Sequence, residues 1–105
     1  MNRNDVFARD GWRCVYCGEV FAAEELTVDH VQARMRGGDR SGGNLVSACR
    51  ACNAAKGHRP LARFLADEPA AHANFLRHAR HVWPRHLRAL EEEVAARVAG
   101  RRRGT

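Results

Sequence analysis

Lysine is almost absent from this chain of 105 residues, and long apolar segments are missing as well. Lys56 is the only lysine among 18 basic residues; a coding bias would explain this, but arginine's planar guanidinium also suits phosphate oxygens. No apolar run reaches the roughly 20 residues that span a bilayer, and residues 1–5 lack the apolar segment of a signal peptide. We therefore expect a cytoplasmic protein with no membrane partner.

Acidic residues are outnumbered, and the formal net charge is +6. Residues 1–59 hold nine basic and seven acidic residues, whereas residues 60–105 hold nine and five. A basic surplus favours a polyanionic partner, although a ribosomal or membrane-surface role would fit the charge alone equally well. Because the surplus is larger after residue 59, the C-terminal part is the expected electrostatic arm.

All four cysteines stand in two CxxC pairs, Cys14-Val-Tyr-Cys17 and Cys49-Arg-Ala-Cys52. Two such turns supply the four sulfur ligands that a structural zinc ion takes in tetrahedral geometry. Cytoplasmic thiols stay reduced, so paired cysteines there indicate a metal more often than a disulfide. A redox role would favour a lone CxxC at a helix start beside a βαβ pattern, which this chain lacks. The spacing therefore predicts a structural zinc site.

Local patterns in the first 59 residues predict short elements around these cysteines. Asn4 can cap an N-terminal helix, and residues 12–21 read as a hairpin around the first CxxC. Residues 26–31 favour a strand, and after a glycine-rich loop residues 44–48 can form a short second strand or a turn. Residues 49–56 favour a helix. This segment is the predicted zinc-containing core.

Beyond residue 59 the chain is rich in alanine, leucine and arginine. Three helices are predicted, each starting near a proline, because proline is favoured at the first helical position: Pro60, Pro69 and Pro84. We expect residues 60–100 to form a helical extension packed on or beside the core, and residues 101–105 to be a disordered basic tail. The extension could serve as a DNA-backbone arm, as a dimer interface through residues 87–98, or as the cover of the core.

Polar residues lie between and after the CxxC pairs. Asp29-His30 ends the first predicted strand, Asn44 begins the second, and Asn53 follows the second CxxC. Singly, these residues are ordinary: a hydrogen-bonded ring, a turn residue and a cap. Together they offer one potential general base and hard oxygen ligands of the kind that Mg²⁺ or Mn²⁺ prefers. A histidine pKa of about 6.5 leaves much of the ring neutral at physiological pH.

The order of these motifs resembles the HNH endonucleases, in the branch that carries two CxxC pairs. The resemblance covers roughly residues 3–60, and the C-terminal helices lie outside it. The residues that carry it are the segment 9–18, Asp29-His30, Gly37-Gly38, Asn44-Leu45, Cys49-x2-Cys52-Asn53 and Lys56-Gly57.

This resemblance implies an α+β chain, a small ββα-metal (His-Me finger) domain stapled by the four-cysteine zinc site, with C-terminal helices. It implies that His30 is the general base, that Asp29 and Asn53 hold a catalytic Mg²⁺ or Mn²⁺ ion, and that Asn44 orders the loop and orients the histidine. Asn53 stands where the family has His or Asn, which makes this an H-N-N variant. The implied activity is metal-dependent hydrolysis of DNA phosphodiester bonds.

Other residues around this set have less defined roles. Lys56 shares a helical face with Asn53 and would either contact a phosphate or lie in solvent. Arg34 and Arg36 flank the loop after His30 and would hold the DNA backbone. His58 lies off the face of Asn53 and is a weaker candidate for an extra metal ligand.

One geometric condition follows from the adjacency of Asp29 and His30. Neighbours on a regular strand face opposite sides, so both can serve one site only from a strand end or a bulge.

Other functions fit parts of the pattern. A non-catalytic zinc-containing module that binds nucleic acid would explain the cysteines and the charge, but not the coexistence of Asp29, His30 and Asn53. A nuclease directed at RNA, or a component of a larger restriction or packaging complex, also stays open, because phosphate contacts carry no sequence information. A homodimer stays open as well, since concerted cutting of both strands would need a dimer or a second encounter.

Overall fold

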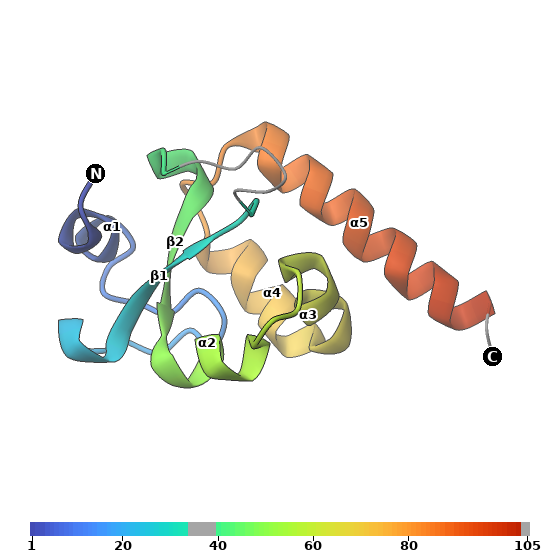
Figure 1. Cartoon of the computed structure of the whole chain (residues 1–105), viewed down its shortest axis with the longest axis horizontal. Coiled ribbons are helices and arrows are strands. Elements are labelled where there is room, and N and C mark those ends of the chain that lie inside the picture. Colours follow the sequence, from blue (N-terminus) through green and yellow to red (C-terminus); the bar gives the residue numbers. More distant parts are fainter. Residues whose placement is uncertain (34–39, 104–105) are drawn as a thin grey trace.

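The computed structural model describes residues 1–33 and 40–103, and Figure 1 shows helices arranged around a two-stranded sheet. Strands β1 (Leu26–His30) and β2 (Leu45–Cys49) pair antiparallel, with Leu26 opposite Cys49 and His30 opposite Leu45. A 3-10 turn precedes each strand, at Ala23–Glu25 and Gly42–Asn44. Both predicted strands are therefore confirmed.

Five α-helices flank this sheet in the described residues: α1 (Arg3–Arg9), α2 (Arg50–Lys56), α3 (Leu61–Asp67), α4 (Pro69–His78) and α5 (Pro84–Arg103). The sheet, these helices and the four gathered cysteines confirm the α+β fold class. No helix in residues 1–33 and 40–103 combines the length and apolarity needed to cross a membrane.

Local rules account for where the helices begin. Each C-terminal helix starts at or just after a proline, as predicted, since proline needs no hydrogen-bond partner for its nitrogen in the first turn. The cap of helix α1 lies two residues before the predicted one, at Asn2 rather than Asn4. The side chain of Asn2 accepts from the amide of Asp5, and Asp5 accepts from the amide of Asn2, which completes a capping box.

One hydrophobic cluster joins the core to the C-terminal helices. The ring of Tyr16, inside the first CxxC, lies edge-on to Phe64 of α3 at 5.4 Å and stacks on Phe75 of α4 at 6.1 Å. Asn74 donates a hydrogen bond of 2.9 Å to the carbonyl of Tyr16. The helices after residue 59 therefore help to bury the cysteine turn.

Helix α5 packs on the same cluster along one stripe. Leu90 and Val94 are buried, and Leu87 and Val98 pack partly buried against the core. The apolar residues of this stripe are therefore engaged inside the molecule, as expected if α5 covers the core.

The end of α5 differs from the expected disordered tail. Residues 101–103 are helical, because Arg101 donates to the carbonyl of Ala66 at 2.9 Å and pairs with Asp67. Arg59 also pairs with Asp67, and hydrogen bonds from Arg59 and Arg101 lower the pKa of this carboxyl group. Residues 104–105 lie outside the described part of the chain.

Trp83, just before α5, clamps the turn that precedes β2. Its backbone amide donates to the carbonyl of Gly43 at 2.9 Å. A Cβ atom added to Gly43 would lie only 2.0–2.1 Å from three atoms of the indole ring. Glycine at position 43 is therefore required by this contact.

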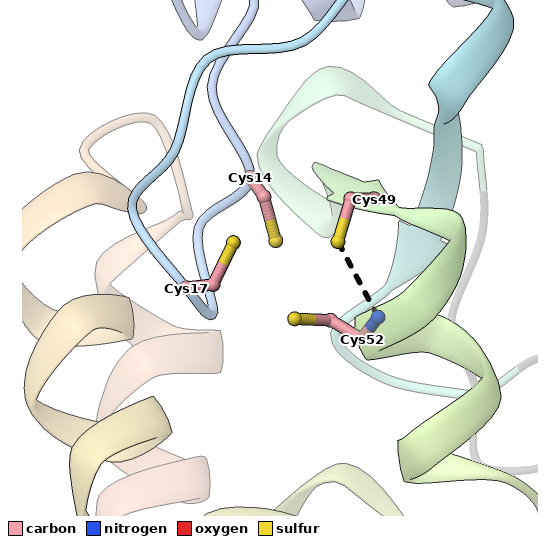
Figure 2. Close-up of side chains that lie close together, drawn as sticks. All are labelled: Cys14, Cys17, Cys49 and Cys52. Atoms are coloured by element: carbon pink, nitrogen blue, oxygen red, sulfur yellow. Dashed lines mark hydrogen bonds between the residues drawn. The ribbon is translucent and has the colours of Figure 1, made fainter.

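The four cysteines converge between the N-terminal turn and the sheet (Figure 2). Cys14 and Cys17 come from the turn, Cys49 ends β2, and Cys52 lies in the first turn of α2. All four sulfur atoms lie within 4.8 Å of one another. Zn–S bonds of about 2.3 Å would hold the sulfurs roughly 3.8 Å apart, so the cluster has nearly the size that zinc requires.

Backbone amides prepare two of the sulfurs for a metal. The amide of Tyr16 donates to Cys14 Sγ, and the amide of Cys52 donates to Cys49 Sγ, each at 3.3 Å. Without a metal, burial raises the pKa of Cys17 to about 11 and also raises that of Cys52. Burial acts the same way on Cys49, but hydrogen bonds from Cys52 and the neighbouring thiols outweigh it and lower the pKa. The four cysteines together form a cluster that resembles a zinc site.

Zinc removal should unfold the core. Purified protein should contain one zinc ion per chain, and chelation or Cys17→Ser should abolish the cooperative thermal transition, because four thiols would then lose the ion that joins two separate segments. Metal analysis and melting by circular dichroism measure both effects. A metal-free protein with an unchanged melting temperature would contradict this prediction.

Gly43→Ala should destabilise the fold by about 1–3 kcal/mol, because the new methyl group overlaps the indole of Trp83. Gly100→Ala is the matched control, since a Cβ at this helical position meets no atom within 4 Å. Urea unfolding should show a loss for Gly43→Ala and no loss for Gly100→Ala. Equal stability of the two variants would mean that Trp83 does not clamp the turn.

Candidate active site

Asp29 and His30 lie at the end of β1. Two neighbouring residues can serve one site only from a strand end or a bulge, and the structure provides a strand end. Residue 30 is the last residue of the strand, so the alternation of the strand stops there. Asp29 contacts Lys56 of α2, and His30 lines a cleft that Lys56 also lines. The strand end thus brings both neighbours to one region.

The carboxylate of Asp29 is held by three donors. It accepts the hydroxyl of Tyr16 at 2.6 Å, the Lys56 ammonium at 2.7 and 2.9 Å, and the amide of His30 at 3.0 Å. Burial, and then the charge of Asp29, raise the pKa of Tyr16 well above its usual value, so the hydroxyl stays protonated and donates. The structure therefore fixes this carboxylate firmly.

Two of these partners were not foreseen from the sequence. Lys56 is only 9% exposed, which rules out the solvated-surface alternative. The sequence predicts no role for Tyr16, because it lies 13 residues from Asp29 and the CxxC spacing does not indicate a contact between them. Tyr16 is the only tyrosine of the chain and lies between Cys14 and Cys17, which is the one sequence feature that could have drawn attention to it.

Asn44 holds the chain that follows His30. Its side chain is fully buried, accepts the amide of Gln32 at 2.8 Å and donates to the carbonyl of Gln32 at 3.0 Å. Its own carbonyl accepts the amide of Val31 at 2.9 Å. This bonding fixes the backbone directly after His30, as the loop-ordering role would require.

Arg9 and Asp10 form hydrogen bonds with the backbone of β2 and of the turn before it. Arg9 donates to the carbonyls of Gly42 and Leu45, each at 2.7 Å, and Asp10 accepts the amide of Ser47 at 2.9 Å. Arg9 and Asp10 also pair with each other at 2.9 Å. These two residues of the segment 9–18 therefore position the strand that follows Asn44.

Asn53 lies beside the strand rather than on Asp29. Its amide donates to the hydroxyl of Thr27 at 3.2 Å, and Thr27 and Asp29 share a face of β1 because they are two residues apart. Asn53 and Lys56 thus face the same strand, but Lys56 makes the contact with Asp29. The remaining candidates, Arg34 and Arg36, lie outside the described residues.

A cleft of about 250 Å³ opens beside His30. His58 and Arg59, which follow α2, also line it, and α5 contributes Leu90 and Glu93. Cationic side chains in a concave site can bind a phosphodiester. The cleft is therefore built partly by the helical extension.

The ligand atoms available at each site determine which metal ion that site could bind. Within residues 1–33 and 40–103, the four cysteines are the only group of three or more His, Cys, Asp or Glu side chains gathered tightly enough for an ion. A second ion would therefore rely on Asp29, the amide of Asn53 and water, which are hard oxygen ligands. The part-buried carboxylate of Asp29 is paired with a cation in this structure, the Lys56 ammonium.

Comparison with known proteins relates part of the chain to one family. Residues 14–59 match the family described as HNH endonuclease. No curated protein matches the chain. Among solved structures, the chain is similar to the Type II-C Cas9 enzyme from Actinomyces naeslundii, with 27% identity and a TM-score of 0.53.

That similarity covers 91% of this chain and 12% of the Cas9 chain, so this protein spans only a small part of its length. Because 91% of this chain is covered, the similar region must extend beyond residue 59 and include part of the C-terminal helices. The chain therefore contains an HNH endonuclease domain, which residues 14–59 form.

Proposed function

We propose that this protein is a metal-dependent DNA endonuclease that hydrolyses phosphodiester bonds. The observation that carries the proposal is the end of β1, where His30 lines a cleft together with Lys56, His58 and Arg59. The neighbouring Asp29 bonds the Lys56 ammonium. The HNH domain and the similarity to a Cas9 enzyme support a nuclease. The net charge of +6 supports a polyanionic substrate.

His30 is the proposed general base. His30 lines the cleft, and its imidazole would take a proton from the attacking water, which histidine can do near neutral pH. The hydrogen bonds of Asn44 to Gln32 and Val31 fix the backbone on which this ring depends. Asn44 is therefore proposed to position the base rather than to react.

Asp29 and Asn53 are the proposed ligands of a catalytic Mg²⁺ or Mn²⁺ ion. When bound, such an ion would stabilise the phosphorane and the departing 3′ oxygen. Tyr16 and the amide of His30 hold the carboxylate of Asp29 in place through bonds that do not involve Lys56. These bonds would keep Asp29 oriented when Lys56 leaves it.

Cationic side chains would hold the substrate. Lys56, released from Asp29, is proposed to contact a phosphate, with Arg34 and Arg36 on the flanking DNA backbone. The four cysteines are proposed to hold a structural zinc ion that takes no part in the chemistry.

His30→Ala and Asp29→Ala should abolish Mg²⁺- or Mn²⁺-dependent relaxation of supercoiled plasmid while leaving the zinc content unchanged. Loss of a general base alone typically lowers a rate about 10²–10⁴-fold. His72→Ala is the matched control, since His72 bonds Glu91 between α4 and α5, away from the cleft, and this variant should retain cleavage. Cleavage that survives in His30→Ala would refute the assignment of the base.

Lys56→Met should bind Mn²⁺ about tenfold more tightly than the wild type, because the ammonium no longer occupies both oxygens of Asp29. Titration followed by electron paramagnetic resonance of free Mn²⁺ measures this affinity without any cleavage. Arg63→Met removes one exposed cation elsewhere and should leave the affinity unchanged. Equal or weaker binding by Lys56→Met would show that the ion does not use Asp29.

A further inference from the structure

The segment that joins α4 to α5 has an unusual composition. Residues 77–88 read Arg-His-Ala-Arg-His-Val-Trp-Pro-Arg-His-Leu-Arg, with four arginines, three histidines, one tryptophan and no acidic residue. The match to the HNH family ends at residue 59, so it assigns this segment no role. Arginine interleaved with aromatic rings is typical of surfaces that bind nucleic acid.

The structure places most of this charge on the surface. Val82 is buried and anchors the segment, whereas all four arginines and His81 are exposed. Trp83 keeps 37% of its surface exposed, although tryptophan is a large apolar residue. The Arg85 guanidinium lies 4.7 Å from the Trp83 ring centroid, and His86 stacks on the same ring at 5.6 Å.

This aromatic stack is fixed next to the proposed active site. The amide of Trp83 bonds the carbonyl of Gly43, and the indole lies directly over this glycine. Asn44, the next residue, holds the backbone after His30. Trp83 is therefore held on the turn whose next residue orders the backbone after His30.

A second cleft, of about 470 Å³, adjoins the same segment. His78, Arg80 and His81 line it from one side, and Arg9, Asp10 and Arg13 line it from the other. Asp10 is bonded by Arg9 and by the amide of Ser47, so its charge is already compensated. Burial, and then the nearby charges of Arg13 and Arg77, lower the pKa of His78, as expected beside a positive surface.

We propose that residues 77–88 form a second DNA-binding surface. The arginines bind phosphates of the backbone in and around the second cleft, and Trp83 with His86 packs against a sugar or base of the same strand. This inference rests on the proposed function, because it takes the substrate to be DNA. It adds residues that lie outside the HNH domain to the substrate path.

The test compares the double variant Arg80→Gln/Arg85→Gln with the double variant Arg63→Gln/Arg103→Gln, which removes the same charge from exposed arginines on α3 and α5. Binding of a short DNA duplex is measured by fluorescence anisotropy over a salt series without divalent ions. Each phosphate contact contributes a slope of about −0.9 in log K against log[salt]. Loss of two contacts should therefore flatten the slope by roughly 1.8, and the control should keep the wild-type slope.

A second measurement reports on the stack directly. Trp12→Phe leaves Trp83 as the only tryptophan, and DNA should quench its fluorescence. An unchanged salt slope in Arg80→Gln/Arg85→Gln, a change equal to that of the control, or failure of the wild type to bind DNA would each overturn the proposal. Plasmid cleavage is scored separately, so cleavage with an unchanged slope refutes this surface alone, whereas a flattened slope without cleavage refutes only the nuclease.

Discussion

The contact between Tyr16 and Asp29 joins the three parts of this protein. The backbone of Tyr16 belongs to the first cysteine turn, its ring lies between α3 and α4, and its hydroxyl reaches the carboxylate at the end of β1. A metal that fixes the turn thereby fixes the ring, and the ring fixes the carboxylate. Stability and the geometry of the candidate site consequently depend on the same side chain.

The same contact explains why the fold needs more than the HNH domain. Residues 14–59 are too few to bury a sizeable core, and small domains bury a low fraction of their surface. Phe64 and Phe75 supply the apolar partners that Tyr16 needs, and α5 adds Leu90 and Val94 to the same cluster. We infer that the extension acts first as the cover of the core and, through Glu93 and Trp83, also shapes the surroundings of the site.

Sequence patterns could predict the features that depend on near neighbours. Prolines mark the starts of three helices because their effect is local, and CxxC spacing places two sulfurs on one turn. The contacts made by side chains across long separations could not be predicted. Asp67 fixes Arg101 from 34 residues away, which makes the expected disordered tail helical up to Arg103.

The candidate site shows the same division. Spacing predicts that Asn53 and Lys56 share a helical face, yet it cannot tell which one reaches Asp29, since this depends on how α2 lies across the strand. The shorter amide stops at Thr27, and the longer ammonium extends to the carboxylate. The length of each side chain and the placement of α2 together decide which residue reaches Asp29.

The pairing of Lys56 with Asp29 also bears on how such a site can exist before it binds metal. A part-buried carboxylate is costly without partners, and the Lys56 ammonium offsets the charge of Asp29 beside its two hydrogen-bond donors. An ammonium on a flexible four-carbon side chain can fill this role and then move, whereas an arginine would hold the carboxylate in a rigid two-pronged contact. The single lysine in a chain whose other cations are arginines stands where this mobility is useful. The only lysine of the chain therefore has a distinct physical role at this position.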